Sequence, residues 1–398
     1  MFRDNDGAGP GHGDELSVPP STRRLLVVVA SALAVATLLG IVVLRARDDP
    51  KNRLGQLDLG ATFYDARVQT VDAERRCDSG DASTRCPQAW VRLLEGPDRG
   101  STTLLDLPGG AARVRFSEGD KVVVAASSAP DGTTTYAFTD RQRKPVLVWL
   151  AVAFAVVVVA LGRLRGLAAL AGLVASLCVL LAFVLPAILV GHDPLLVAVV
   201  GSAAIAFLAL YLAHGFRPAT TVALLGTLAS LALTAVLALV VTELAALTGY
   251  ASEEATIVQL AQSTIDLQGL VLAGVVIGAL GAIDDMTVTQ VAAVGELHRA
   301  NPGMGRRPLY RSAMRIGRDH VASTVNTLAL AYAGASIPLL LLFVLSQQSL
   351  GSVANGEVVA TEIVRTLVGS IGLVSAVPIT TWLAVRTLPA RSLTPPEP

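Results

Sequence analysis

Long apolar runs recur along this 398-residue sequence, and they constrain its fold more than any other feature. A helix of about 20 apolar residues is long enough to cross the hydrocarbon core of a bilayer. Hydrophobic residues make up 53% of the chain and charged residues only 16%. The sequence therefore predicts a polytopic α-helical membrane protein. The eight candidate spans are Leu25–Leu44, Val146–Leu161, Leu167–Val190, Leu195–Ala213, Thr220–Thr242, Leu270–Gly295, Val321–Leu345 and Val364–Val385.

Arginines in alternate short loops predict the orientation of these spans. Lys and Arg accumulate in short cytoplasmic loops, and they occur here at 163–165, at 217 and throughout 299–318. The intervening short loops are acidic or neutral. Eight spans with both termini in the cytoplasm satisfy this pattern. The long segment 45–145 then lies outside, which its arginines do not oppose, because long loops translocate largely regardless of charge.

The change from apolar to polar composition divides the chain into five segments. The first apolar run is about twice as long as the core of a signal peptide, so we favour an uncleaved anchor over a cleaved signal. The predicted segments are a disordered cytoplasmic N-terminus (1–24), a transmembrane anchor (25–44), an extracytoplasmic β domain (45–145), a seven-helix membrane domain (146–386) and a cytoplasmic tail (387–398).

Segment 45–145 has the short alternating runs and turn residues of a small β domain. Five short strands suit an OB-like barrel, and a sandwich is the alternative. Turns are expected at Gly96–Gly100 and at Glu118–Asp120. The predicted strands are Ala61–Val71, Ala89–Leu94, Ser101–Asp106, Lys121–Ala126 and Thr133–Thr139.

Two cysteines of the β domain, Cys77 and Cys86, are expected to form a disulfide. Both fall on the oxidising side of the membrane, with eight residues between them. A metal or redox pair is the alternative, but the domain has no histidine and no CxxC spacing. No catalytic constellation, metal site or cofactor is expected anywhere in the chain.

Two adjacent aspartates, Asp284 and Asp285, interrupt the apolar run of the sixth span. A carboxylate near the centre of a bilayer is costly unless it is paired, hydrated or protonated. Helical spacing puts Asp285 on one stripe with Gly274 and Gly278, so we expect Asp285 to point into a helix–helix contact. Asp284 lies about 100° away around the helix. Thr287, Thr289, Gln290 and Glu296 are further candidate site residues.

Two other interpretations of the acid pair stay open at this point. The sixth span could end near Ala282, with Asp284 as the N-cap of a new helix, because Asp is a favourable N-cap. The pair could also lie in a re-entrant break of the span. In the first case both carboxylates would be interfacial rather than buried.

The segment after the acid pair is strongly basic. The loop 299–320 is expected to bind anionic lipid headgroups in addition to setting the topology. A sharper hypothesis is that Arg299 or Arg315 neutralises an aspartate. Asn326 and Ser323 share a face of the next span that could meet the acids, although such residues also hold helices together.

The residues around the acid pair carry a family resemblance. The run GAIDDMTVTQVAAVGEL at 281–297 is followed by RANP at 299–302 and RIGRDHVASTVNT at 315–327. This motif is similar to that of the YibE/F-like family of bacterial multi-pass membrane proteins, in its actinobacterial form. The resemblance implies a location in the bacterial cytoplasmic membrane. The resemblance makes the polar residues of this motif candidate site residues, but it does not imply a substrate.

Transport of a small solute or ion is the favoured function, with Asp285 binding a proton or cation and Asp284 tuning it. The alternative is a non-catalytic envelope assembly or sensing protein whose β domain binds a partner. An intramembrane aspartyl protease is disfavoured, because that chemistry needs aspartates from separate spans. Nucleic acid is not an expected partner, since the net charge is zero and no basic tract has interleaved aromatics. The sequence does not predict the oligomeric state.

Overall fold

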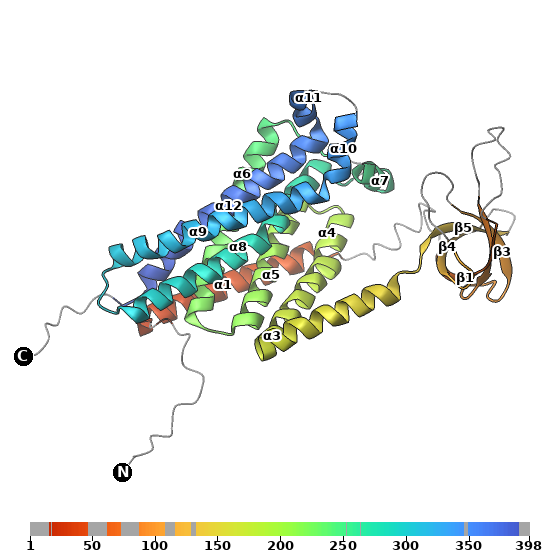
Figure 1. The fold of residues 1–398 in the computed structure, drawn as a ribbon. Helices are drawn as coiled ribbons and strands as arrows, with labels where there is room; N and C mark the ends of the chain where they lie inside the picture. Colours follow the sequence, from red (N-terminus) through yellow and green to blue (C-terminus); the bar gives the residue numbers. More distant parts are fainter. Residues whose placement is uncertain are drawn as a thin grey trace, which may run out of the picture. The chain divides into compact units, whose positions relative to one another are not determined.

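The computed structural model describes residues 16, 18–46, 62–72, 87–107, 116–128, 133–251, 253–262, 264–345 and 349–389 (Figure 1). The chain divides into two compact units, one of residues 1–50 with 159–398 and the other of residues 51–158. The first unit is helical, and the second contains the β-sheet.

Helices account for most of the described chain, in agreement with the predicted helical membrane protein. A short π-helical segment, η2, joins α3 to α4 just before Pro186. The helical elements are α1 (Pro20–Leu44), α3 (Lys144–Val179), η2 (Leu180–Val184), α4 (Leu185–Leu189), α5 (Pro194–His214), α6 (Pro218–Leu244), α7 (Glu253–Ala261), α8 (Leu267–Ala300), α9 (Arg306–Ala335), α10 (Ile337–Leu345), α11 (Leu350–Asn355) and α12 (Glu357–Thr387).

Six helices of the described residues are long and apolar enough to cross a membrane: α1, the continuous stretch Lys144–Leu189, α5, α6, α8 and α12. The bent pair α9–α10, with a 62° angle between its parts, makes a seventh if it is counted as one span. The prediction of eight spans is therefore not confirmed. Val146–Leu161 and Leu167–Val190, expected as two spans, fall on one stretch whose backbone leaves helical geometry at Arg163 (φ 50°, ψ −127°).

Helix α8 is at the centre of the helical unit and packs against α5, α6, α9 and α12. Helices α6 and α12 also contact each other closely, because a threonine side chain of each helix packs against a glycine of the other. A Cβ on Gly226 would lie 2.2 Å from Thr380 Oγ1, and one on Gly372 would lie 2.0 Å from Thr234 Oγ1. Small residues of this kind let membrane helices approach.

The β unit is a small antiparallel sheet that curls into a half-barrel (Figure 1). Its strand order is β3-β2-β1-β4-β5, and every neighbouring pair is antiparallel. All five strands begin and end within two residues of the predicted bounds. They are β1 (Thr62–Asp72), β2 (Gln88–Leu93), β3 (Thr102–Asp106), β4 (Lys121–Ser128) and β5 (Thr134–Arg141).

Turn glycines and alternating burial explain why the strands could be predicted so closely. Gly96, Gly100 and Gly119 have φ near +92°, a conformation that glycine adopts without a steric penalty. Along β2 the buried and outward residues alternate, as in a sheet with one covered face. The OB-like description of this sheet is not confirmed. Cys77 and Cys86 lie outside the described residues, so the disulfide stays a prediction.

Candidate functional site

The acid pair lies at the middle of one unbroken helix, α8. This helix begins after Asp266, whose side chain accepts a hydrogen bond from the Gln268 backbone N–H (3.1 Å). Its 34 residues span about 51 Å at 1.5 Å per residue, compared with about 30 Å for a hydrocarbon core. The interpretation of Asp284 as an N-cap and the interpretation of a re-entrant break are therefore wrong.

Asp284 is partly buried and faces a hydroxyl cluster between α6 and α8. Thr227 Oγ1 lies 3.5 Å from Asp284 Oδ1 and 2.8 Å from Thr287 Oγ1. The Thr287 hydroxyl donates to the Asp284 backbone carbonyl (2.9 Å). Thr227 and Thr287 are both fully buried. The carboxyl group of Asp284 thus reaches into the packed centre of the helical unit.

Asp285 points about 100° away from Asp284 around α8, toward α9. Its side chain is 68% exposed, and its Oδ2 is 3.9 Å from Nε2 of His320 on α9. The expectation that Asp285 points into a tight helix contact, with Asp284 outside it, is therefore wrong; the two residues are reversed.

Long side chains, rather than a neighbouring backbone, occupy the space beside the glycine stripe of α8. A Cβ on Gly274 would lie 3.4 Å from Arg365 Nη2, and one on Gly278 would lie 3.1 Å from the Tyr332 hydroxyl. Gly281 has no such neighbour within 4 Å. The closely packed face of α8 instead contains Ile283 and the residues around it.

Gln290 connects three helices. Its side chain is 1% exposed, and its Nε2 donates to the Ala313 carbonyl on α9 (2.9 Å) and to Thr381 Oγ1 on α12 (2.8 Å). A Cβ on Gly317 of α9 would lie 2.7 Å from Gln290 Oε1, so the glycine makes room for this amide. Gln290 therefore joins α8 to both neighbours.

The remaining predicted residues do not gather at the acids. Glu296 is exposed and pairs with Arg299 on its own helix, so Arg299 does not neutralise an aspartate. Arg315 and Asn326 are exposed, and within the described residues neither has an ion pair or hydrogen bond to an acid. Thr289 is partly buried.

Several polar residues that the sequence reasoning missed lie buried beside the site. Thr227, Ser230 and Thr234 follow one face of α6, and the spacing of three and four residues was a visible signal. The Ser230 and Thr234 hydroxyls donate to carbonyls four residues earlier, both at 2.8 Å. Buried Thr380 has no hydrogen-bond partner for its hydroxyl among the described residues.

A second charged pair lies within α12. An arginine inside an apolar run is the sequence signal that could have predicted this pair. Arg365 Nη1 lies 2.6 Å from Glu362 Oε1, and both side chains are largely covered. Together with Leu267 they line a cavity of about 300 Å³. Polar groups of α9 and α12 therefore flank the glycine stripe of α8.

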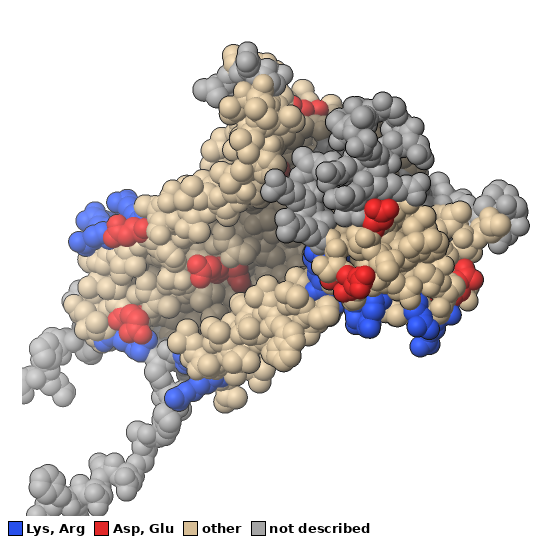
Figure 2. All heavy atoms as spheres, turned by 45° about the vertical axis from the view of Figure 1, so that its right-hand side comes forward, with Lys and Arg blue, Asp and Glu red and all other residues tan. Residues whose placement is uncertain are grey.

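The basic segment after α8 is helical from Arg306 onward. Leu309, Ala313 and Gly317 form its buried face, and most of its arginines are exposed. In Figure 2 the Lys and Arg residues of the helical unit are concentrated toward one end, and other residue types form most of its sides. The binding of anionic lipid headgroups by the segment 299–320 stays a prediction.

Comparison with protein families identifies one match. The family described as YibE/F-like protein matches residues 150–390, more than half of the chain and the whole of α8. The resemblance carried by the motif around the acid pair is thus confirmed. The comparisons with curated proteins and with solved structures gave no match.

Proposed function

We propose that this chain, which belongs to the YibE/F-like family, transports a small solute or ion across the membrane with Asp284 as its ion-binding carboxylate. One observation carries the proposal. A carboxyl group lies halfway along a 34-residue apolar helix and faces the packed centre of the helical unit. Ionisable groups at such a depth are costly, and they commonly mark ion or proton pathways.

The surroundings of Asp284 suit a proton or a hard cation. Within the described residues no Lys, Arg or His forms an ion pair with this carboxyl group, and its side-chain neighbour is the Thr227 hydroxyl (3.5 Å). Carboxylate and hydroxyl oxygens are the ligands that hard cations take. A bound proton or cation would balance the charge that no protein side chain balances there.

The structure of α8 favours Asp284 over Asp285 for this role. The exposed Asp285 faces His320, which makes it a group of the α8–α9 surface. Tyr332 of α9 and Arg365 of α12 lie beside the glycine stripe that leads along α8 to Asp285. We infer that this stripe is the side from which the acid pair is reached.

Flux in proteoliposomes tests the proposal, with Asp284→Asn and Asp285→Asn as a matched pair. Trapped pH-sensitive, Na⁺-sensitive and K⁺-sensitive dyes report proton and cation movement when Na⁺, K⁺ or candidate solutes are added outside. We expect a flux that Asp284→Asn abolishes and that Asp285→Asn leaves measurable. Equal flux in wild type and Asp284→Asn contradicts the assignment, and so does a wild-type protein without flux under all of these gradients.

The finer topology is also a proposal. If the break at Arg163 divides Lys144–Leu189 into two spans and α9–α10 forms one, the chain crosses the cytoplasmic membrane of a bacterium eight times. Both termini would then be cytoplasmic and the β unit extracytoplasmic. Reporter fusions at each end test this arrangement.

The β unit supports a second candidate function, envelope assembly or sensing. Trp90 and Leu104 are direct neighbours on β2 and β3, and both are exposed on the outer face of the sheet. Exposed aromatic residues are enriched at protein interfaces. The strand order and the contact between β3 and β5 favour an OB-like barrel. Recovery of a discrete envelope partner by the wild type, but not by Trp90→Ser, would support this function.

A further inference from the structure

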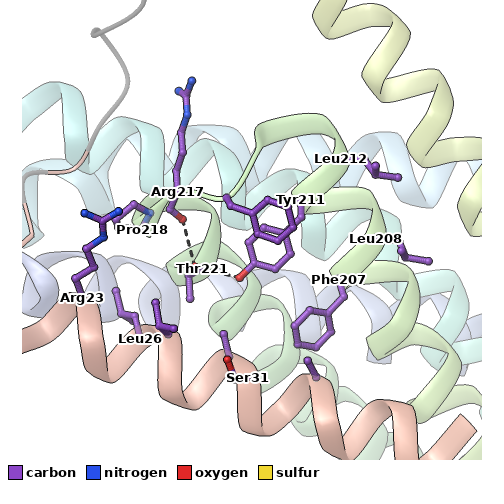
Figure 3. Close-up of a pocket in the computed structure, with 14 residues that line it drawn as sticks. Arg23, Leu26, Ser31, Phe207, Leu208, Tyr211, Leu212, Arg217, Pro218 and Thr221 are labelled. Atoms are coloured by element: carbon purple, nitrogen blue, oxygen red, sulfur yellow. Dashed lines mark hydrogen bonds between the residues drawn. The ribbon is translucent and has the colours of Figure 1, made fainter.

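A cleft of about 460 Å³ lies between α1 and the helices α5 and α6 (Figure 3). This volume is within the range of about 300–1,000 Å³ that is usual for small-molecule sites. Leu26 and Ala30 of α1 form one wall, and Phe207 and Leu208 of α5 form the other. Neither aspartate of the acid pair lines it.

Two arginines lie at the same end of the cleft. Arg23 is in the first turn of α1, and Arg217 is the residue that precedes α6. In Figure 3 both side chains extend to the same side. Beside them the Tyr211 and Thr221 hydroxyls are 3.1 Å apart, and Thr221 also donates to the Arg217 carbonyl (3.2 Å). The cleft thus has a cationic, hydrogen-bonding end.

Apart from Ser31, the rest of the cleft is apolar and aromatic. The rings of Tyr211 and Phe216 stack with their centroids 4.6 Å apart. The ring centroid of Phe207 lies 6.2 Å from that of Tyr211. Phe216 and Leu212 line the cleft and are 87% and 45% exposed. In a membrane-embedded bundle such exposed apolar groups face lipid, so the cleft is open to the bilayer.

We propose that this cleft binds one anionic phospholipid, with its phosphate between Arg23 and Arg217 and an acyl chain along the apolar wall. Arginine recognises phosphate oxygens through its planar set of donors. The ends of membrane helices lie near the headgroup region, where arginines and aromatic rings anchor. A water-soluble anion would use only the cationic end, whereas a phospholipid matches both ends.

Tryptophan quenching by brominated lipid tests the site in the full chain. Trp90, Trp149 and Trp382 are first replaced by Phe. One reporter, Phe207→Trp, then lies in the cleft, and a matched reporter, Val236→Trp, lies on the exposed flank of α6. Each is reconstituted in phosphatidylcholine–phosphatidylglycerol vesicles of one fixed composition, with bromine on either lipid.

We expect the Phe207→Trp reporter to prefer brominated phosphatidylglycerol roughly tenfold, because two arginines near the surface attract the anionic lipid. The Val236→Trp reporter should show little preference. Arg23→Gln and Arg217→Gln should each reduce the preference at the cleft without changing the control. Equal quenching by both lipids at the cleft, or a preference unaffected by both arginine variants, overturns the proposal. If Phe207→Trp does not fold, Leu212→Trp at the cleft margin replaces it.

Discussion

Replacing Gly372 with alanine tests the packing between α6 and α12. The added Cβ would lie 2.0 Å from Thr234 Oγ1 and 3.2 Å from Thr234 Cβ. Thr234 is fully buried, and its hydroxyl donates to the Ser230 carbonyl at 2.8 Å. Thr234 must rotate and lose this hydrogen bond, and its Cβ would still lie 3.2 Å from the new methyl carbon, so α6 and α12 must also move apart.

The expected cost follows from three contributions. Overpacking of a well-packed core costs about 1–3 kcal/mol. Loss of the Thr234 hydrogen bond costs about 1 kcal/mol. Alanine is favoured over glycine in a helix interior by about 1 kcal/mol. The last two contributions cancel, so Gly372→Ala should lower the free energy of unfolding by about 1–3 kcal/mol.

Equilibrium unfolding in mixed detergent–SDS micelles measures this change. Gly281→Ala is the matched control, because a Cβ there meets no neighbour within 4 Å, and it should be neutral or slightly stabilising. Thr234→Ala removes the clashing oxygen. The double variant should therefore lose less free energy of unfolding than the two single variants lose together. If Gly372→Ala behaves like Gly281→Ala, or if the double variant shows no rescue, this account of the packing is refuted.

Two further changes test other parts of the structure. Gln290→Leu removes hydrogen bonds to α9 and α12 and should destabilise by about 2–3 kcal/mol in the same unfolding assay, whereas Thr289→Val should have little effect. In the β unit, burial and the hydrogen bond to Asp98 (2.7 Å) raise the pKa of Tyr136 to about 12. Because this pKa is above the unfolded value of about 10, the contribution of Tyr136 to stability is present below pH 10 and is lost between about pH 10 and 12. Asp98→Asn should lower the pKa of Tyr136, and a tyrosine NMR titration that shows no such decrease would contradict this assignment.

Local signals made much of the fold predictable from sequence. The strands follow from alternation and turn glycines, both of which are properties of a few consecutive residues. The first half of α9 was expected as a basic loop, although Leu309 and Ala313 already had helical spacing. The number of spans was harder, since the break at Arg163 separates two apolar runs without a long polar loop.

The candidate site was predictable only in part, because periodicity shows which residues share a face but not what lies opposite that face. The stripe through Gly278 and Asp285 was correctly expected on one side of α8. Its neighbours are the ends of Tyr332 and His320, rather than a closely packed backbone. The hydroxyl partner of Asp284 comes from α6, and only the folded chain brings it near.

Asp284 and Asp285 are adjacent in the sequence but have different surroundings, which indicates different roles for the two carboxyl groups. Consecutive helical residues differ by about 1.5 Å in depth and about 100° in direction. Asp284 therefore faces the α6–α8 hydroxyl cluster, and Asp285 faces the open α8–α9 surface at nearly the same depth. A transported ion must exchange between an enclosed and an accessible environment. Under the proposed function, Asp285 is positioned to pass a proton or cation to Asp284 without movement along the helix axis, so loss of Asp285 should slow the exchange while loss of Asp284 should stop it.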